Sequence, residues 1–292
     1  MTSRSSMQKS LLKRYFHEDD TMNDILICSS VQMDCRPGDI QYNLKKAGEF
    51  AAKAYENGTE ILVFPELLDI GYDLSALSTL KIDTSNTVDT VSKIAKDNNM
   101  YIVAGLTEME KSEGVFYNTV YVFNNDGEIV VKYRKINLFS LSNETKCFKP
   151  GIEPQSFKIN NVKVGIMICY DLRFPELARH YFKDGCKAII ISSAFPKPRQ
   201  EHWKTLLRAR AVENQLYVIA SNRVGNVNGI EFAGSSSIID PWGEVVESID
   251  NDSEGIVRGC ISMSKVDEVR KTIPCYDDML RLDRDILNFY RS

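Results

Sequence analysis

Short apolar segments of strand length alternate with amphipathic helical segments from Ile25 onward. Residues 25–33 are rich in β-branched side chains, residues 39–57 carry apolar side chains at helical spacing, and residues 60–64 are almost entirely apolar. Periodicity of this kind separates strands from helices in a sequence. Strands that alternate with helices are typical of α/β proteins, in which helices cover the faces of a largely buried sheet.

The same alternation continues to residue 261. It predicts further helices at residues 88–99, 174–183 and 201–215, and strands at 101–107, 116–123, 128–132, 155–159, 163–168, 188–192, 216–221, 235–239, 244–248 and 256–261. Turn signals at residues 124–127, 160–161 and 240–243 join three pairs of these strands as hairpins. Because hairpins give antiparallel neighbours and helical crossovers give parallel ones, we predict mixed sheets. The two similar halves favour two sheets that face each other, with helices outside.

No Pro-, Gly- or Ser-rich linker interrupts the chain after residue 24, so we predict one domain over residues 25–262. Residues 1–24 begin with a Ser-, Lys- and Arg-rich stretch that lacks the apolar core of a secretory signal. We expect them to form a disordered extension. Residues 263–292 are charged and weakly helical, and we expect this tail to pack on the domain or on a dimer partner.

The composition excludes several classes of protein. The formal net charge is −4, whereas proteins that bind nucleic acid or anionic membranes need a basic face. No apolar run approaches the roughly 18 residues of a membrane span. The seven cysteines form no CxxC pair and are accompanied by three histidines, which argues against a disulfide scaffold and a structural zinc site. We therefore expect reduced thiols, a cytoplasmic location, no nucleic-acid or membrane partner, and neither a metal nor a cofactor.

Two candidate catalytic residues stand at the ends of predicted strands. Glu66 follows an apolar strand, and ligand sites in α/β sheets gather at the carboxyl ends of strands. Apolar neighbours raise the pKa of a carboxylate, which suits a general base, although a solvated loop glutamate is the alternative. Cys169 ends another strand shortly before Pro175 opens a helix, which is the geometry of a nucleophile elbow. The alternative for Cys169 is a buried structural cysteine.

Two further charged residues lie between these positions. Lys135 is followed by the apolar residues Ile136, Leu138 and Phe139. These would draw the lysine inward toward an anionic partner, unless it belongs to an exposed basic loop. Glu144, taken alone, is a polar loop residue. The sequence contains no HExxH motif, no GxGxxG dinucleotide fingerprint and no P-loop.

Five segments become more specific when they are taken together and in order. They are FPE at 64–66, YRKINLF at 133–139, ICYDLRFPELAR at 168–179, HWKTLLRARAVENQLYVIASNRVG at 202–225 and GSSSIIDPWGEVV at 234–246. With Gln32 and Asn43, they closely resemble the nitrilase superfamily of carbon–nitrogen hydrolases over roughly residues 25–261. The resemblance implies a four-layer αββα sandwich with two mixed sheets. It also implies a homodimer formed through the helices at 174–183 and 201–215.

The resemblance further implies a Glu-Lys-Cys triad. Glu66 matches the general base, Lys135 the catalytic lysine and Cys169 the nucleophile, and Glu144 matches a second glutamate that often joins them. By this resemblance, Glu66 takes the thiol proton and Cys169 attacks an amide carbonyl. Lys135 and the backbone N–H of Tyr170 then stabilise the oxyanion.

Two positions vary among relatives. Many have His where Asn137 stands here, which puts the packing beside the catalytic lysine in question. N-carbamoyl amidases and nitrilases often have Trp where Tyr170 stands, whereas CYDLRFPE is most similar to the omega-amidase and deaminated-glutathione amidase branches. We therefore expect the substrate to be a small ω-amide of a dicarboxylic acid, such as 2-oxoglutaramate.

A remote carboxylate on such a substrate needs a cation. Arg173 is the candidate, because arginine binds carboxylates bidentately, and a structural salt bridge is its alternative role. Phe195 follows the strand after Cys169 and is expected to border the pocket. Two other functions stay open: a hydrolase of the same fold that acts on N-carbamoyl amines or nitriles, and a non-catalytic small-molecule-binding protein.

Overall fold

The computed structural model describes residues 24–79 and 84–279 and contains two six-stranded sheets packed face to face. The first sheet has the order β14-β1-β2-β3-β4-β5, and the second has the order β13-β12-β9-β8-β7-β6. In the first, β1–β2–β3 are parallel and the remaining neighbours antiparallel. In the second, β7–β8–β9 are parallel. Both sheets are therefore mixed, as predicted.

The strand bounds follow the expected segments closely. The first sheet comprises β1 (Ile25–Gln32), β2 (Ile61–Val63), β3 (Tyr101–Glu110), β4 (Val115–Phe123), β5 (Ile129–Arg134) and β14 (Gly255–Ser262). The second comprises β6 (Ser156–Ile159), β7 (Val162–Ile168), β8 (Ala188–Ser193), β9 (Tyr217–Asn222), β12 (Ser237–Ile239) and β13 (Val245–Ser248). A separate small hairpin, β10 (Asn226–Val227) and β11 (Ile230–Glu231), was not expected, because strands of two residues leave no alternation to detect.

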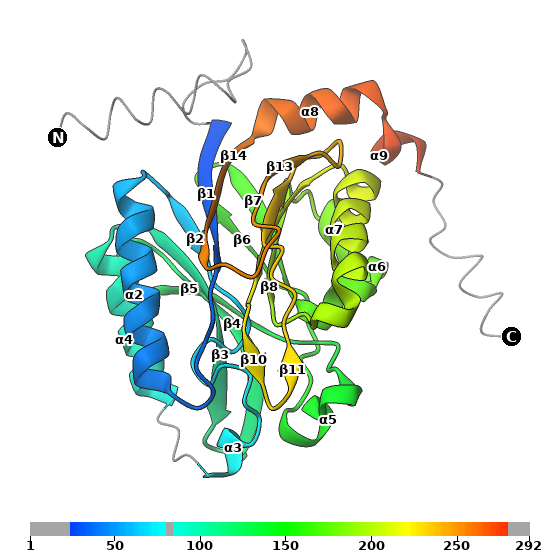
Figure 1. The fold of residues 1–292 in the computed structure, drawn as a ribbon. Coiled ribbons are helices and arrows are strands. Elements are labelled where there is room, and N and C mark those ends of the chain that lie inside the picture. Colours follow the sequence, from blue (N-terminus) through cyan, green and yellow to red (C-terminus); the bar gives the residue numbers. More distant parts are fainter. Residues whose placement is uncertain (1–23, 80–83, 280–292) are drawn as a thin grey trace, which may run out of the picture.

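Helices cover the outer face of each sheet. Figure 1 shows α2 (Ile40–Glu56) and α4 (Thr84–Asp97) on one side and α6 (Pro175–Lys183) and α7 (Gln200–Asn214) on the other, with the sheets between them. The prediction of a four-layer αββα sandwich is confirmed. The α4 helix begins four residues earlier than predicted because its first turn, Thr-Ser-Asn-Thr, carries no apolar residue that marks the helical period.

Short helices complete the described chain: α3 (Ala76–Thr79), α5 (Glu144–Cys147), α8 (Met263–Thr272), α9 (Cys275–Asp278), and the 3-10 turns η2 (Ser140–Ser142), η3 (Cys169–Arg173) and η4 (Lys197–Arg199). Helix α8 lies against the end of the sandwich, where Val266 and Val269 are buried and Arg270 Nη2 donates to Cys186 O at 2.9 Å. The expected extension lies almost entirely outside the described residues, as does the end of the tail, so the domain bounds stay predictions. No helix in ranges 24–79 and 84–279 is long and apolar enough to cross a membrane.

The interface between the sheets is apolar, with a few polar links. The aliphatic residues of β7, β8 and β9 pack against Leu26, Ile61 and Val103 of the first sheet. Between β1 and β9, Ser30 Oγ donates to Ala220 O at 2.7 Å and Ser221 Oγ donates to Val31 O at 2.6 Å. These two bonds satisfy buried hydroxyls whose desolvation would otherwise be costly. They also fix how one sheet sits on the other.

Candidate active site

The predicted site residues stand at strand ends in both sheets. Glu66 follows β2 and Lys135 follows β5 in the first sheet, while Cys169 follows β7 in the second. Glu66 and Lys135 are fully buried, and Cys169 is 5% exposed. The side chains of all three lie within electrostatic reach of one another. The docking of the sheets therefore brings together residues that are about 100 positions apart in the chain.

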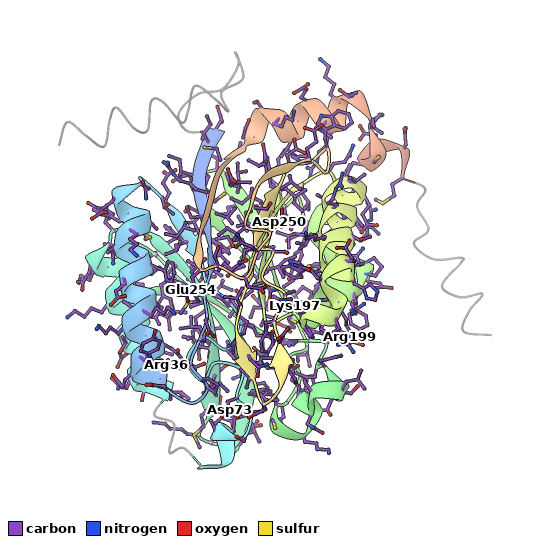
Figure 2. All side chains as sticks on the ribbon, viewed as in Figure 1. Arg36, Asp73, Lys197, Arg199, Asp250 and Glu254 are labelled. Carbon is purple, nitrogen blue, oxygen red and sulfur yellow. The ribbon has the colours of Figure 1, made fainter. Side chains whose placement is uncertain are left out.

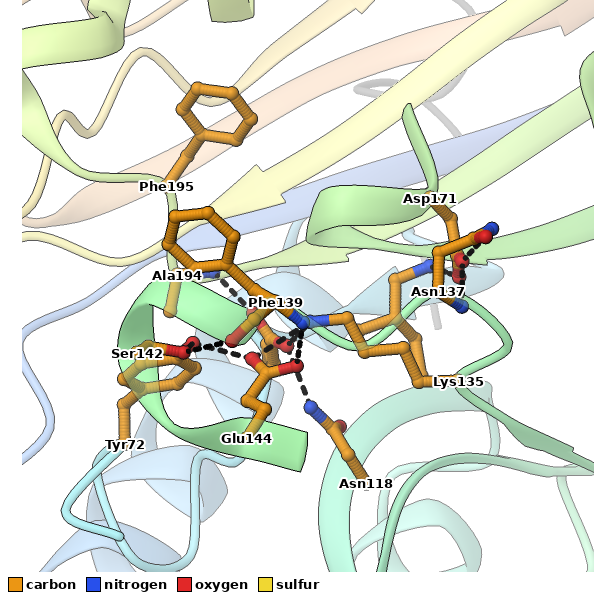
Figure 3. A network of polar contacts seen from close by, with 12 residues as sticks. Tyr72, Asn118, Lys135, Asn137, Phe139, Ser142, Glu144, Asp171, Ala194 and Phe195 are labelled. Carbon is orange, nitrogen blue, oxygen red and sulfur yellow. Dashed lines mark hydrogen bonds and ion pairs between the residues drawn. The ribbon is translucent and has the colours of Figure 1, made fainter. Parts of the chain in front are cut away.

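Lys135 lies between two buried carboxylates. Its Nζ donates to Glu66 Oε1 at 2.7 Å and to Glu144 Oε1 at 2.9 Å. Figure 3 shows Lys135 and Glu144 side by side. Burial alone would lower the pKa of Lys135, but the charges of Glu144 and Glu66 outweigh it and hold that pKa above its usual value. Lys135 is therefore a fixed positive charge.

Glu66 is held by three donors. Besides Lys135, Asn118 Nδ2 donates to its Oε1 at 2.7 Å, and the Ala194 backbone N–H donates to its Oε2 at 2.9 Å. Burial raises the pKa of this carboxyl, and the charge of Lys135 offsets only part of the rise. A carboxylate with a raised pKa is a better proton acceptor near neutral pH than a solvated glutamate.

Glu144 opens α5, a four-residue helix that the sequence had indicated only as a loop. Its Oε1 accepts from Tyr72 Oη at 2.5 Å, and its Oε2 accepts from the Phe139 N–H at 2.9 Å. Burial raises the pKa of Tyr72, so its hydroxyl keeps its proton and remains a donor. Sequence reasoning missed Tyr72, which stands in a loop with a left-handed φ of 61° and no motif around it.

Cys169 stands at a sharp turn. Its φ of 44° is left-handed, a conformation that non-glycine residues adopt at a cost and that is common at functional sites. It opens η3, and Pro175 then starts α6. Burial and the charge of Glu66 raise the pKa of the thiol, while Lys135 opposes them. The buried site therefore disfavours the thiolate, which is the nucleophilic form of a cysteine.

Asp171 joins the turn at Cys169 to the segment that carries Lys135. Its Oδ1 accepts from both the backbone N–H and the side-chain Nδ2 of Asn137, each at 2.9 Å. Its Oδ2 accepts from Tyr133 Oη at 2.7 Å and from the Ile168 N–H at 3.0 Å. Asn137, the position that the sequence left in question, is thus bound to Asp171 through both its backbone N–H and its side-chain amide.

A cavity opens beside the thiol. Tyr170, Arg173 and Phe195, all predicted from the sequence, line it together with Cys169 and Tyr72. The Tyr170 ring packs on Phe139 with centroids 4.9 Å apart, and the Phe195 backbone N–H donates to Asn222 Oδ1 at 2.7 Å. The sequence did not point to Arg199, which lines the same cavity from η4, a turn too short to show periodicity.

Comparison with known proteins assigns the chain to a family. The family model described as carbon-nitrogen hydrolase matches residues 28–271. A 2-oxoglutaramate amidase of Bacillus subtilis is 41% identical over 252 residues, which cover 86% of this chain and 96% of the relative. An omega-amidase of Mus musculus is 34% identical over 243 residues, covering 80% and 87%.

Solved structures have the same architecture. A nitrilase-superfamily protein of Saccharomyces cerevisiae, assigned to branch 10, superposes with a TM-score of 0.80 and 28% identity over 90% of this chain and 97% of its own. A variant of an amidase from Nesterenkonia sp., with acrylamide added at its active site cysteine, gives 0.76 and 25% identity over 86% and 99%. The family model covers most of the chain, and the two sheets have the architecture of these solved structures. The chain is therefore a carbon-nitrogen hydrolase of the nitrilase superfamily.

Proposed function

We propose that the protein is an amidase in which Cys169 is the nucleophile, Glu66 the general base and Lys135 the oxyanion-stabilising cation. The observation that carries this proposal is the placement of Lys135, fully buried between Glu66 and Glu144 and beside the thiol. Burying three ionised groups is costly, and such arrangements are concentrated at functional sites. The active site cysteine named for the Nesterenkonia relative supports the same role for Cys169.

The proposed reaction has two halves. Glu66 accepts the proton of the Cys169 thiol, and the thiolate attacks the amide carbonyl to form a tetrahedral oxyanion. Lys135 Nζ and the Tyr170 backbone N–H stabilise that oxyanion, and the loss of one such donor typically costs about 10²- to 10³-fold in rate. The protonated Glu66 then gives its proton to the leaving nitrogen. The C–N bond breaks, ammonia departs, and the acyl group remains as a thioester.

Hydrolysis of the thioester uses the same carboxylate. Glu66 accepts a proton from water, the hydroxide attacks the thioester carbonyl, and the C–S bond breaks. The thiolate recovers the proton and the carboxylic acid leaves. Throughout, Glu144 fixes Lys135 and is itself held by Tyr72, so the cation does not move as charge develops.

For the substrate we propose a small ω-amide of a dicarboxylic acid, such as 2-oxoglutaramate. The names of the Bacillus subtilis and Mus musculus relatives support this class. Arg173 supports it as well, because the guanidinium lines the cavity and forms no ion pair within the described ranges. Its side-chain partners there are His202 Nδ1 at 3.4 Å and the Phe195 ring at 5.3 Å. The structural salt bridge considered as an alternative is therefore not formed with any described residue.

We also propose that the protein works as a homodimer in a reducing compartment such as the cytoplasm. Val212 of α7 and two residues of the β12–β13 hairpin, Trp242 and Val245, are large apolar side chains exposed on one face. They lie together, since Gly243 packs directly on Val212. Clustered exposed apolar residues favour association with a partner. All seven cysteines are free thiols, which suits a reducing environment.

The test is ammonia release from 2-oxoglutaramate, succinamate, glutamine, deaminated glutathione, an N-carbamoyl amine and a simple nitrile, with Cys169→Ser as the control. We expect release from an ω-amide and at least a 10³-fold loss in the Cys169→Ser protein. Release only from the carbamoyl compound or the nitrile would replace the substrate class and keep the mechanism. Binding of these compounds without release of ammonia would instead support the other function left open by the sequence, a non-catalytic small-molecule-binding protein.

A further inference from the structure

The cavity beside Cys169 continues into a groove on the surface. Phe139, Ser142, Pro196, Arg199 and Ile230 line both the cavity and the groove. Cys169 and Arg173 line only the inner part. An acyl group attached to Cys169 can therefore extend past Arg173 toward the surface. At the junction of the cavity and the groove it lies next to the cationic side chain of Arg199.

No residue in the described part of the chain neutralises the charge of Arg199 at this junction. The residue ends the η4 turn, where its backbone N–H donates to Pro196 O at 3.0 Å, and its half-buried guanidinium lies over the Phe139 ring at 5.6 Å. No carboxylate pairs with it among residues 24–79 and 84–279. A half-buried arginine without an acidic partner is suited to bind an anion from outside, and its planar fork matches a carboxylate.

Lys197, two residues earlier, shows the opposite arrangement. Its Nζ lies 2.6 Å from Asp252 Oδ2 and 3.8 Å from Glu231 Oε2, so its charge is neutralised within the protein. Figure 2 labels both cations, which lie near the β10–β11 hairpin. The same short turn thus presents one cation that is paired and one that is free to bind a ligand, which makes Lys197 a matched control.

We propose that Arg199 is a specificity-determining residue that binds the remote carboxylate of longer dicarboxylic monoamides, beyond the reach of Arg173. This inference rests on the proposed amidase function. The two guanidinium groups lie at different depths of one channel. Arg173 binds the carboxylate of compact substrates, and Arg199 binds the carboxylate of longer ones. A neutral amide binds neither guanidinium group, so its kcat/KM measures only the reaction at Cys169.

The experiment compares kcat/KM for succinamate, glutaramate and adipamate with that for butyramide, a neutral amide, in the wild type, Arg199→Gln, Arg199→Lys and Lys197→Gln proteins. We expect Arg199→Gln to lower kcat/KM for adipamate about 10- to 100-fold, mainly through KM, because a charge-assisted hydrogen bond is lost. Succinamate, butyramide and glutaramate, which has the same chain length as 2-oxoglutaramate, should change less than threefold. Arg199→Lys should restore part of the loss, and Lys197→Gln should resemble the wild type.

Several results would overturn the inference. An equal loss on butyramide would show that Arg199 supports the structure of the site. An equal loss on all three anionic amides would show that it does not select chain length, and no loss on any of them would show that it does not bind the carboxylate. A failure of the proposed function looks different: the wild type itself would then show no preference for anionic amides over butyramide.

Discussion

At the scale of single residues, the site depends on charges that the fold buries in pairs. Lys135 Nζ lies 2.7 Å from Glu66 Oε1 and 2.9 Å from Glu144 Oε1, and neither glutamate is exposed. Breaking a buried ion pair by removing one partner is far more damaging than losing a surface pair, because the remaining charge stays desolvated. The same contacts that position the lysine for catalysis are therefore needed for stability.

Replacing Lys135 by Met should damage both properties. The two carboxylates would be left buried and unpaired, so we expect a loss of about 3–5 kcal/mol in the free energy of unfolding at pH 8, together with loss of amide hydrolysis. The loss of stability should shrink at pH 5, because burial raises the pKa of Glu66 and a protonated Glu66 carries no charge. Urea unfolding across this range measures it. Lys149→Met, which breaks an exposed pair with Glu113, should change the stability little at any pH, because solvent screens that pair.

A loss for Lys135→Met that does not vary with pH would contradict this account. It would mean that the cost comes from packing of the lysine stem and not from the carboxylates.

Asp69 provides a second test of buried charge. It accepts from the Thr107 N–H at 2.9 Å, and burial raises its pKa from 3.8 to about 6. Asp69 holds its proton more tightly in the folded state than in the unfolded state, so protonated Asp69 contributes about 3 kcal/mol to the stability of the fold. This contribution is complete below pH 3.8 and is lost as the pH rises through about 6. Asp69→Asn cannot titrate. Its stability relative to the wild type should therefore rise between pH 4 and 7, as followed by thermal unfolding, whereas a constant difference would refute the argument.

The sequence allowed the prediction of Glu66 and Cys169 because each follows an apolar strand, whereas Lys135 was indicated by the apolar residues after it and by the family resemblance. An apolar strand is visible as a pattern, and its end is where α/β sheets place ligands. Tyr72 and Arg199 could not be predicted in this way. They stand in a loop and in a three-residue turn, and it is tertiary packing that turns them toward the cavity.

At the scale of elements, close backbone packing positions Glu66, the proposed general base. Gly105 of β3 lies against the segment after β2, and a Cβ at this position would be 2.7 Å from Glu66 Cα and 2.8 Å from Pro65 O. Backbone atoms cannot rotate away as a flexible side chain can. The absence of a side chain at Gly105 therefore determines where Glu66 sits.

Gly105→Ala should displace Glu66 and reduce kcat by about 10- to 100-fold, with a loss of about 1–3 kcal/mol in stability. Gly48→Ala in α2 is the matched control. Its Cβ would have no neighbour closer than 3.8 Å, so it should keep full activity and gain about 0.5–1 kcal/mol from better helix propensity. Steady-state kinetics and urea unfolding of both proteins test this. Normal kcat in Gly105→Ala would show that Glu66 tolerates the shift.

Long helices were predictable from the sequence, and helices of a single turn were not. The α2 helix has five turns of amphipathic pattern, with Asp39 capping its start and Asn57 at its end, and was predicted almost to the residue. The α5 helix has four residues, fewer than two turns, so no period exists in it. It forms because Glu144 is drawn to Lys135 and Tyr72, contacts that the folded protein creates.

At the scale of the whole molecule, the exposed apolar face around Val212 predicts the oligomeric state. Val212→Asp should convert the proposed dimer to a monomer, because a charge in an apolar interface is costly to desolvate. Val130→Asp, on a similarly exposed valine of β5, should leave the dimer intact. Sedimentation velocity distinguishes the two. A monomeric wild type, or a dimer that survives Val212→Asp, would exclude this face as the interface.

The division of the site between the two sheets has a consequence for the order in which the chain is made. Glu66, Lys135 and Glu144 all lie before residue 145, and Cys169 follows them, while the Ala194 N–H that holds the base comes later still. Synthesis proceeds from the N-terminus, and domains generally fold as units. Under the proposed mechanism, a growing chain already carries Glu66 and Lys135 when Cys169 emerges, but Glu66 cannot activate the thiol until the segment after β8 has docked and Ala194 holds the carboxylate. We therefore expect Cys169 to be reactive only in the finished protein and inert in an unfinished or truncated chain.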